Sequence, residues 1–395
     1  MVCRIRQKKS SELNHTMNKQ WNNARIWLEV DLETVRNNFA KIRKAAAPAE
    51  TLAVIKANAY GLGVKPIAQC LLHAGAAGFC AATLEEALEL KPFGKPVQIL
   101  GALLDAEREE AVASDLILGI YDRESAEKIS AEAVRQQKTV ECHFKLDVGM
   151  GRLGILARDA VRTIPEIVRL PNLNCCGIYA HFPASENGES QENLAQIGSF
   201  LAVIRALQEK GISFRKIHMA NSDAINHLPS VRRPPFTHVR AGIDLHGSFS
   251  GGKDGLDLKP VFSLKSRLAA LRRLPAGHGI GYCSTCRLEK DTLVGVVTAG
   301  YADGLPLALS NRGRILVRGK SCPILGRISM DYMTVSLEAF GDCPPPPGSE
   351  VTLIGTENGN SVTAEEWAAI KGTHPYDILC SFGPRVKRCY TGTEK

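Results

Sequence analysis

The sequence predicts an α/β protein that consists of a (β/α)8 barrel of the TIM type followed by a mostly β C-terminal domain. Short apolar, β-branched segments alternate with amphipathic segments from about residue 26 to residue 245, which is typical of repeated βα units. After Pro260 the strand-like segments follow one another with little helix between them. The length of 395 residues also exceeds the usual size of a single core. We therefore expect a barrel domain at residues 26–260, a β domain at 261–395 and a basic N-terminal extension at 1–25.

Eight strand-like segments favour a closed barrel. They are residues 52–56, 78–82, 97–100, 116–121, 140–147, 175–182, 214–220 and 238–243. Helical patterns lie between them at residues 83–90, 107–114, 124–137, 159–170, 192–210 and 223–228, several with Ser, Thr or Asp as the N-cap. An open doubly wound sheet fits less well, because no Gly-x-Gly-x-x-Gly follows the first strand. Active sites of barrels form at the C-terminal ends of the strands, so reactive residues are expected there.

The expected β domain contains six strand-like segments and a short helix. The strands are residues 261–274, 292–299, 314–317, 323–330, 332–337 and 351–354. Thr363 precedes Glu365 and Glu366, and an N-cap followed by an acidic first turn predicts a helix. Helix is thus a minor part of this domain.

Composition and charge exclude several classes of protein. Hydrophobic residues make up 44% of the chain, and no segment approaches the roughly 20 apolar residues of a membrane helix. Residues 1–23 lack the apolar stretch of a secretion signal, so we expect a cytoplasmic protein that binds no membrane. The net charge of +8 is interleaved with acidic residues, which argues against nucleic acid as a partner.

The 12 cysteines are scattered along the chain, and several lie on predicted strands. A thiol there acts as a small apolar side chain, and disulfides are not implied. Cys283 and Cys286 have the spacing of zinc ligands, but no second pair or histidine follows at ligand spacing. No metal site is expected.

Lys56 ends the first predicted strand of the barrel and leads into a turn that contains Gly61 and Gly63. Desolvation at such a position lowers the pKa of the ammonium group and leaves an amine that can form a Schiff base with an aldehyde cofactor. The same placement also suits a lysine that extends from a strand end into water. The ends of the other strands bear on this choice.

Polar residues end several other predicted strands. Strand five runs into Arg152, whose guanidinium can hold an anionic oxygen, although a tight turn with a surface arginine has the same pattern. Strand six ends at His181, which also suits a packed, hydrogen-bonded histidine. The loops after strands seven and eight supply Ser222 and the amides of residues 240–243. Barrels commonly bind phosphate at these two loops.

Several motifs resemble those of alanine racemases and follow in the order of that family. They are residues 53–63 (AVIKANAYGLG), 145–154 (KLDVGMGRLG), 240–243 (RAGI), 300–304 (GYADG), 326–331 (GRISMD), 374–377 (HPYD) and 383–388 (GPRVKR). The resemblance covers roughly residues 26–390. It implies a pyridoxal-phosphate enzyme of the fold-type III barrel family that interconverts L-alanine and D-alanine. It also implies a cytoplasmic homodimer with shared active sites that supplies D-alanine for peptidoglycan.

The resemblance further implies the two bases of the reaction. Lys56 forms a Schiff base with pyridoxal 5'-phosphate and exchanges the α-proton of the D-enantiomer. Tyr282 of the partner subunit serves the L-enantiomer from the opposite face, with a neighbouring base to lower its pKa. Two bases are needed because a single immobile base tends to return the proton to the face from which it came.

Other roles are carried over from the family residue by residue. The cofactor is bound by Lys56, Tyr60, Arg152, His181, Ser222, Arg240, Gly242, Ile243 and Tyr376. The substrate amino acid is bound by Arg152 and by the amide of Met330. Lys145, which is often carbamylated in the family, and Asp331 support these groups.

Arg240 decides the type of cofactor chemistry that the resemblance implies. In many pyridoxal-phosphate enzymes an acid protonates the ring nitrogen and makes the ring a strong electron sink. An arginine donates a hydrogen bond there but does not readily give up a proton, so the ring stays unprotonated. Transamination is thereby suppressed, as an enzyme that only removes and returns an α-proton requires.

The chain also departs from the family pattern, and three alternatives remain. Cys283 stands where glycine is common, Leu307 where arginine often follows, Glu186 where aspartate is usual, and Ala241 where proline is usual. The changes near the substrate corridor keep open a racemase of broader specificity for serine, lysine or other amino acids. A decarboxylase of basic amino acids is disfavoured by Arg240, and a non-catalytic, cofactor-binding barrel is disfavoured by the large second domain.

Overall fold

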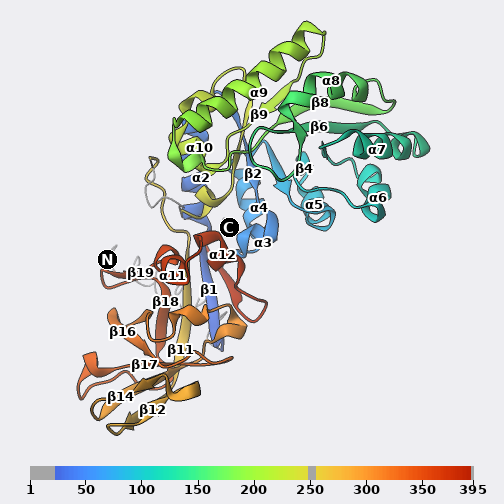
Figure 1. Cartoon of the computed structure of the whole chain (residues 1–395). Helices are drawn as coiled ribbons and strands as arrows, with labels where there is room; N and C mark the ends of the chain where they lie inside the picture. The colour runs from blue at the N-terminus through green and yellow to red at the C-terminus, as the bar shows by residue number, and fades with distance from the viewer. Residues whose placement is uncertain (1–22, 248–254, 393–395) are drawn as a thin grey trace, which may run out of the picture. The chain divides into compact units, whose positions relative to one another are not determined.

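The computed structural model describes residues 23–247 and 255–392 (Figure 1). Residues 1–22 of the expected N-terminal extension lie outside the described residues. Two compact units divide the chain: residues 34–260 form one, and the residues up to 33 together with 261 onward form the other. We call them the barrel unit and the β-rich unit.

The barrel unit is a ring of eight parallel strands in chain order, which confirms the predicted fold. The strands are β2 (Glu50–Val54), β3 (Gly78–Ala81), β4 (Val97–Ile99), β5 (Leu118–Ile120), β6 (Val140–Asp147), β8 (Leu173–Tyr179), β9 (Lys216–His218) and β10 (His238–Ala241). The last strand, β10, pairs in parallel with the first, β2. Between β4 and β5 a single parallel bridge, Gln98 to Ile117, nearly completes the ring. The short β7 (Ile155–Leu156) pairs with the end of β6.

Helices alternate with the strands of this ring, beginning with α2 before β2. They are α2 (Leu32–Ala46), α4 (Val64–His73), α5 (Leu84–Leu90), α6 (Arg108–Ala113), α7 (Arg123–Arg135), α8 (Ala157–Ile167), α9 (Gln191–Glu209) and α10 (Ser222–His227). The sequence analysis missed α2 and α4. Side chains of Thr83, Asp122 and Ser190 cap α5, α7 and α9 by accepting a backbone N–H bond. Among the described residues, no helix combines the length and apolar composition that crossing a bilayer requires.

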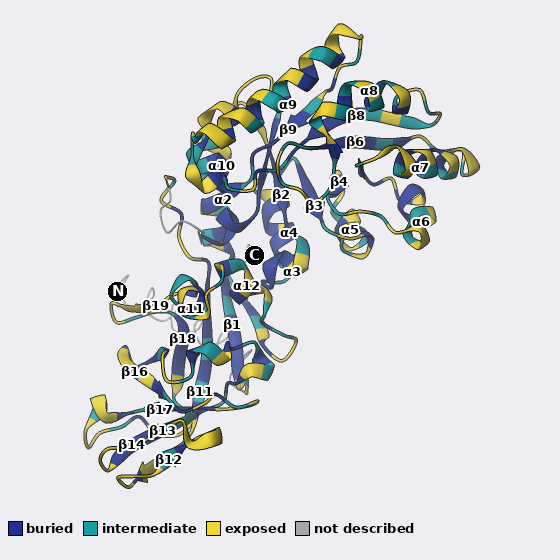
Figure 2. Cartoon of the chain, viewed as in Figure 1, coloured by how far each residue is buried: buried dark blue, intermediate teal, exposed yellow. Residues whose placement is uncertain are grey.

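Alternation along β6 separates the two faces of the barrel wall. Cys142, Phe144 and Leu146 are fully or almost fully buried apolar side chains on one face. Residues 141, 143, 145 and 147 are polar and point to the other side, because successive residues of a strand alternate. Figure 2 shows β2 and β6 mostly buried, while α7 and α9 carry exposed residues. The barrel interior along β6 is therefore polar.

The β-rich unit is built on a nine-stranded sheet. Its strands, in spatial order, are β19 (Asn360–Val362), β18 (Glu350–Glu357), β15 (Arg314–Val317), β16 (Lys320–Leu325), β17 (Met333–Ser336), β14 (Thr292–Val297), β11 (Phe262–Leu274), β1 (Ile26–Asp31) and β20 (Lys387–Thr391). A small hairpin joins β12 (Gly279–Ile280) and β13 (Cys286–Arg287), and α11 (Ala364–Lys371) and α12 (Pro375–Cys380) complete the unit. Trp27 and Trp367 are fully buried in it.

Two sequence-based boundaries need correction. Residues 26–33, expected in the barrel domain, belong to the β-rich unit, because β1 pairs antiparallel with β11 and parallel with β20. The pattern of one strand does not identify its partner strands, so the sequence did not reveal this. The predicted strand 323–330 ends at Leu325, since Gly326 has a φ of 74° and packs against the backbone of Ile280.

Candidate active site

The chain turns left-handed immediately after Lys56, at the end of β2. In the short element α3 (Lys56–Tyr60), the four residues 57–60 have φ values between 51° and 55°. This conformation costs roughly 1–2 kcal/mol for each residue with a side chain. Such strain persists only where the surroundings impose it, and it is concentrated at functional sites. The half-buried Lys56 therefore begins a strained, strand-end turn.

Polar side chains hold this turn in place. The Glu86 carboxylate accepts a hydrogen bond from the Ala57 N–H at 2.7 Å and another from the Ala82 N–H at 2.8 Å. The Asn58 side chain accepts a hydrogen bond from the Val64 N–H at 2.8 Å. The sequence analysis did not name Glu86, although a threonine three residues before a glutamate is a visible capping signal.

Tyr60 and Gly242 meet closely where the turn faces the end of β10. The Tyr60 hydroxyl oxygen lies only 2.7 Å from the position that a Cβ on residue 242 would occupy, so glycine is needed there. The Tyr60 ring packs edge-on against His246 at 5.2 Å between centroids. The His246 Nε2 lies 3.1 Å from the Ala59 carbonyl oxygen, which ties the left-handed turn to the loop after β10.

Ser222 gathers backbone amides at the start of α10. Its hydroxyl oxygen accepts hydrogen bonds from the N–H groups of Gly242 at 3.0 Å and Asp244 at 3.3 Å. Ile243 lies between them and is buried. A hydroxyl, converging amides and a residue without Cβ suit an anionic oxygen that approaches the backbone. The two loops that the sequence indicated thus come together with Tyr60.

Arg240 lies almost fully buried in the barrel, with 4% of its surface exposed. One of its terminal nitrogens donates to the His218 Nδ1 at 2.7 Å. The other donates to the carbonyl oxygens of Ala180 at 2.8 Å and Met219 at 3.2 Å, and lies 3.4 Å from the His181 Nδ1. Burial lowers the pKa of Arg240. The guanidinium is therefore fixed by neutral acceptors rather than by a buried carboxylate.

Cationic groups crowd the same end of the barrel. Burial, together with Arg240 and Arg152, lowers the pKa of Lys145 to about 7. Burial, followed by the charges of Arg240, Lys145 and Arg152, lowers the pKa of His181 to about 2, so this imidazole is neutral. Arg152 itself is exposed. A crowd of positive groups suits a ligand with several negative oxygens. The sequence analysis did not single out His218, which alternation along strand seven places in the barrel interior.

Tyr282 lies in the β-rich unit, and 67% of its surface is exposed. It follows Gly281, whose φ of 71° and close approach to the Arg327 backbone leave no room for a side chain. Tyr282 borders a surface hollow of about 340 Å³ together with Arg327, Ser329 and Tyr332. Its phenol is thus presented outward from this unit.

An arginine that also pairs with a buried carboxylate holds the segment that contains Met330 and Asp331. Arg385 bonds to Asp331 at 2.8 Å and to the buried Asp303 at 3.2 Å. Met330 is half exposed, and its carbonyl oxygen accepts from the Ala302 N–H at 3.1 Å. Tyr376 is partly buried on α12. The structure thus connects Met330 and Asp331 within one unit, and the sequence analysis had not assigned Asp303 to this site.

Comparison with known proteins identifies the family. The model of the alanine racemase N-terminal domain matches residues 30–249, and that of the alanine racemase C-terminal domain matches residues 261–390. The chain belongs to the alanine racemase family. It is 36% identical over 370 residues to an alanine racemase of Carboxydothermus hydrogenoformans, covering 92% of this chain and 99% of that relative. An alanine racemase of Clostridium tetani is 34% identical, with 92% and 95% covered.

Solved structures of alanine racemases have the same fold. The enzyme from Streptomyces lavendulae aligns with a TM-score of 0.87 at 31% identity, covering 94% of this chain and 98% of that one. The enzyme from Bartonella henselae, which has covalently bound pyridoxal phosphate, aligns with a TM-score of 0.84 at 29% identity, covering 93% and 100%. Both units of this chain are therefore those of the alanine racemase family.

Proposed function

We propose that this protein interconverts L-alanine and D-alanine with pyridoxal 5'-phosphate as its cofactor. One observation carries the proposal: the strained Lys56 turn, the buried Arg240 and the amides around Ser222 lie at one end of the barrel in a member of this family. Alanine is preferred over a broader range of amino acids, because the relatives above are all named alanine racemases.

The residues at this end of the barrel fit the cofactor. Ser222 and the amides of Gly242 and Ile243 would hold its phosphate, with Tyr60 beside them. The missing Cβ of Gly242 supports this, since a side chain there would meet the Tyr60 hydroxyl. Arg240 would donate a hydrogen bond to the ring nitrogen, and His181 would lie beside the ring. When bound through Lys56, the cofactor withdraws electrons from the α-carbon of the amino acid.

Two side chains of the protein would transfer the α-proton. Lys56 would hold the α-proton on one face of the substrate, and Tyr282 of the partner subunit would hold it on the other. The 67% exposure of Tyr282 supports this role, because its phenol is accessible to a second chain. The proposal therefore includes a homodimer with shared sites.

Other residues would position the substrate. Arg152 and, across the dimer interface, the amide of Met330 of the partner subunit would bind the substrate carboxylate. Lys145, as an amine or as a carbamate, would support Arg152. Asp331 would keep the Met330 segment in place through Arg385, in accord with their 2.8 Å contact. The proposed cellular role is the supply of D-alanine for peptidoglycan in the cytoplasm.

A racemisation assay tests this function. Purified protein is incubated with L-alanine and, separately, with L-serine, with and without added pyridoxal 5'-phosphate, and the D-product is measured. We expect D-alanine to form in the presence of the cofactor and D-serine to form far more slowly. Absence of D-alanine with cofactor present contradicts the proposal, and equal rates with serine would favour the broader racemase.

A further inference from the structure

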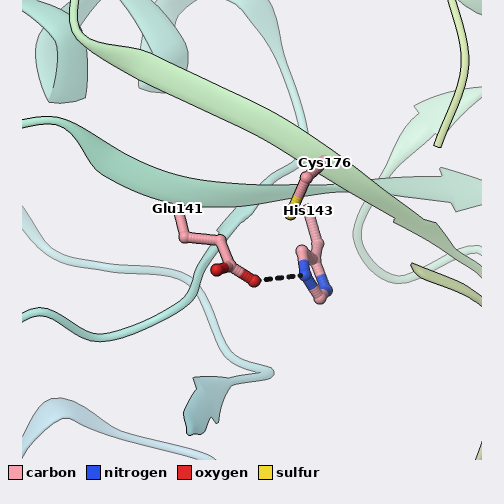
Figure 3. Close-up of side chains that lie close together, drawn as sticks. All are labelled: Glu141, His143 and Cys176. Carbon is pink, nitrogen blue, oxygen red and sulfur yellow. Dashed lines mark hydrogen bonds and ion pairs between the residues drawn. The ribbon is translucent and has the colours of Figure 1, made fainter. Parts of the chain in front are cut away.

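Three side chains with metal-binding atoms lie close together in the barrel unit (Figure 3). They are Glu141 and His143 on β6 and Cys176 on β8. The carboxylate oxygen, the imidazole nitrogen and the sulfur all lie within 4.8 Å of one another. His143 and Cys176 are buried, and Glu141 is partly exposed. Glu141 lies near the beginning of β6, whereas Lys145 lies near its end, so the cluster is toward the amino-terminal mouth of the barrel.

The backbone builds this cluster. Glu141 and His143 are two residues apart on one strand and therefore point the same way. The pairing of β6 with β8 shifts by one residue between Cys142 and His143, so Cys176 is the extra residue of a bulge. Bulges redirect a side chain out of the regular alternation. The next residue is Gly177, and a Cβ there would stand 2.3 Å from the His143 ring. The His143 imidazole thus fills the space that a side chain at residue 177 would need.

The observed separations suit a tetrahedral cation. The Glu141 carboxylate oxygen and the His143 Nε2 are 3.3 Å apart. Oxygen and nitrogen ligands that lie about 2.0–2.1 Å from a tetrahedral Zn²⁺ are themselves about 3.3 Å apart. Carboxylate, imidazole and thiolate together form a donor set that Zn²⁺ accepts. These two ligand atoms need not move to bind it.

A cavity borders His143, one of the three proposed ligands, and could hold a fourth ligand. It has a volume of about 130 Å³, and its lining includes His143, Lys216, His238 and Glu50. A water molecule fits in such a space and has polar partners there. Three protein ligands and one open position are the arrangement of zinc sites that bind water or a small ligand.

Lys216 is the competing cation, since its amine lies 2.7 Å from the same Glu141 oxygen. Its side chain is partly exposed and can turn toward water. A Zn²⁺ ion bound to one carboxylate and one thiolate carries no net charge, so it adds little repulsion to this neighbour. The amine therefore need not prevent binding.

The other ring nitrogen of His143 faces His218 inside the barrel. Its Nδ1 lies 3.4 Å from the His218 Nε2, and the His218 Nδ1 accepts from Arg240 at 2.7 Å. A metal on the His143 Nε2 places the ring proton on Nδ1, which then donates toward His218. The His218 proton then lies on Nδ1 and faces an Arg240 N–H, which cannot accept it, so the hydrogen bond between Arg240 and His218 is lost when the metal binds. Metal binding would thus be felt at Arg240.

We propose that Glu141, His143 and Cys176 bind one Zn²⁺ ion, with a fourth position open to the cavity near the amino-terminal mouth of the barrel. On binding, the Cys176 thiol releases its proton to solvent and the sulfur bonds to the metal. None of the three ligands belongs to the proposed racemase site, which the metal would affect only through His218 and Arg240.

Cobalt titration tests the site. Metal-free protein is titrated with Co²⁺, whose thiolate complexes absorb in the near ultraviolet, and then with Zn²⁺ as a competitor. We expect one equivalent of Co²⁺ to give this band and Zn²⁺ to abolish it. Cys176→Ser should lose the band. Glu141→Gln, at a partly exposed position, should bind at least about ten-fold more weakly, since even an outer partner of a ligand is worth that much.

Cys283→Ser is the matched control, because Cys283 and Cys286 have the spacing of zinc ligands but lie outside the proposed cluster. It should keep the band. The proposal fails if the unaltered protein gives no band, if Cys176→Ser keeps it, or if Cys283→Ser loses it. Circular dichroism establishes that each variant is folded, and if Cys176→Ser does not fold, unchanged affinity in Glu141→Gln overturns the proposal.

Discussion

The candidate residues of the barrel unit and those of the β-rich unit lie in opposite environments. Lys145 and Arg240 are buried, with 5% and 4% of their surfaces exposed, and burial displaces their pKa values. Tyr282 and Met330 are 67% and 51% exposed. The barrel residues thus lie in a buried environment that one chain builds, whereas Tyr282 and Met330 are exposed. The proposed roles accord with this difference: cofactor binding would use residues that one chain buries, whereas the second base would act in a partner subunit.

Replacing Lys56 makes the sharpest test of the barrel side of this contrast. Lys56→Ala should lower racemisation by at least about 10³-fold, because the covalent attachment and one base are lost together. The absorbance of the lysine-linked cofactor should disappear as well. Lys65→Ala is the control, since the Lys65 side chain is 72% exposed and pairs loosely with Glu89 at 3.6 Å. Retention of the lysine-linked absorbance would reassign the attachment site.

Removing the phenol of Tyr282 tests the β-rich side. Tyr282→Phe should keep the cofactor but slow α-proton exchange with L-alanine by about 10²- to 10⁴-fold. Exchange with D-alanine should be less affected, as measured by deuterium incorporation from heavy water. Tyr390→Phe, on β20 of the same unit, serves as the matched control. Full and equal exchange of both enantiomers in Tyr282→Phe would separate Tyr282 from the chemistry.

Acid sensitivity should reveal the burial of His181. The pKa of His181 is lowered from 6.5 to about 2, so between these values the unfolded chain binds a proton that the folded chain does not. The free energy of unfolding should therefore fall as the pH drops below 6.5, by at most about 1.4 kcal/mol per pH unit. His181→Asn removes this dependence. Urea unfolding of both proteins at pH 7 and pH 5 measures it, and identical losses would contradict the burial.

The smallest effect concerns the clamp on the left-handed turn. Glu86→Gln keeps one acceptor oxygen but cannot accept from both amide groups, so it should lower the free energy of unfolding by about 1 kcal/mol. Cofactor affinity should fall as well, because the turn after Lys56 is less firmly held. Glu85→Gln, exposed on the same helix, is the control. Equal stability and cofactor affinity in both variants would show that Glu86 does not hold the turn.

Much of the fold could be predicted because short, buried parallel strands are continuous apolar segments. All eight predicted barrel strands overlap observed ones, and the predicted and observed bounds of β6 are the same, residues 140–147. The sequence analysis missed β1 as a strand, and its pairing with β11 and β20 could not be predicted because apolar alternation does not indicate which sheet a strand joins. Strand 323–330 was predicted too long because Gly326 ends the pairing with a turn that only tertiary contact reveals.

The placement of Lys56, Ser222 and Arg240 at one end of the barrel could be predicted, because each ends or closely follows a strand-like segment. The left-handed conformation of residues 57–60 could not, because Ala, Asn, Ala and Tyr carry no common signal for positive φ. The contact between Glu86 and the Ala57 amide joins residues 29 positions apart. The orientation of Cys176 was also not predictable, because it results from a bulge in the pairing of β8 with β6, which the sequence of β8 alone does not reveal.

The line of polar groups from Arg240 through His218 to His143 and Glu141 also constrains how this barrel can diverge. Replacing one imidazole by an apolar side chain leaves the polar groups on either side of it buried without a hydrogen-bond partner. Replacing all of these polar groups together leaves no such group. A single substitution among these residues should therefore lower the free energy of unfolding more than their joint replacement by apolar residues. Homologues in which one residue of this line is replaced by an apolar residue should have substitutions at the other positions of the line as well.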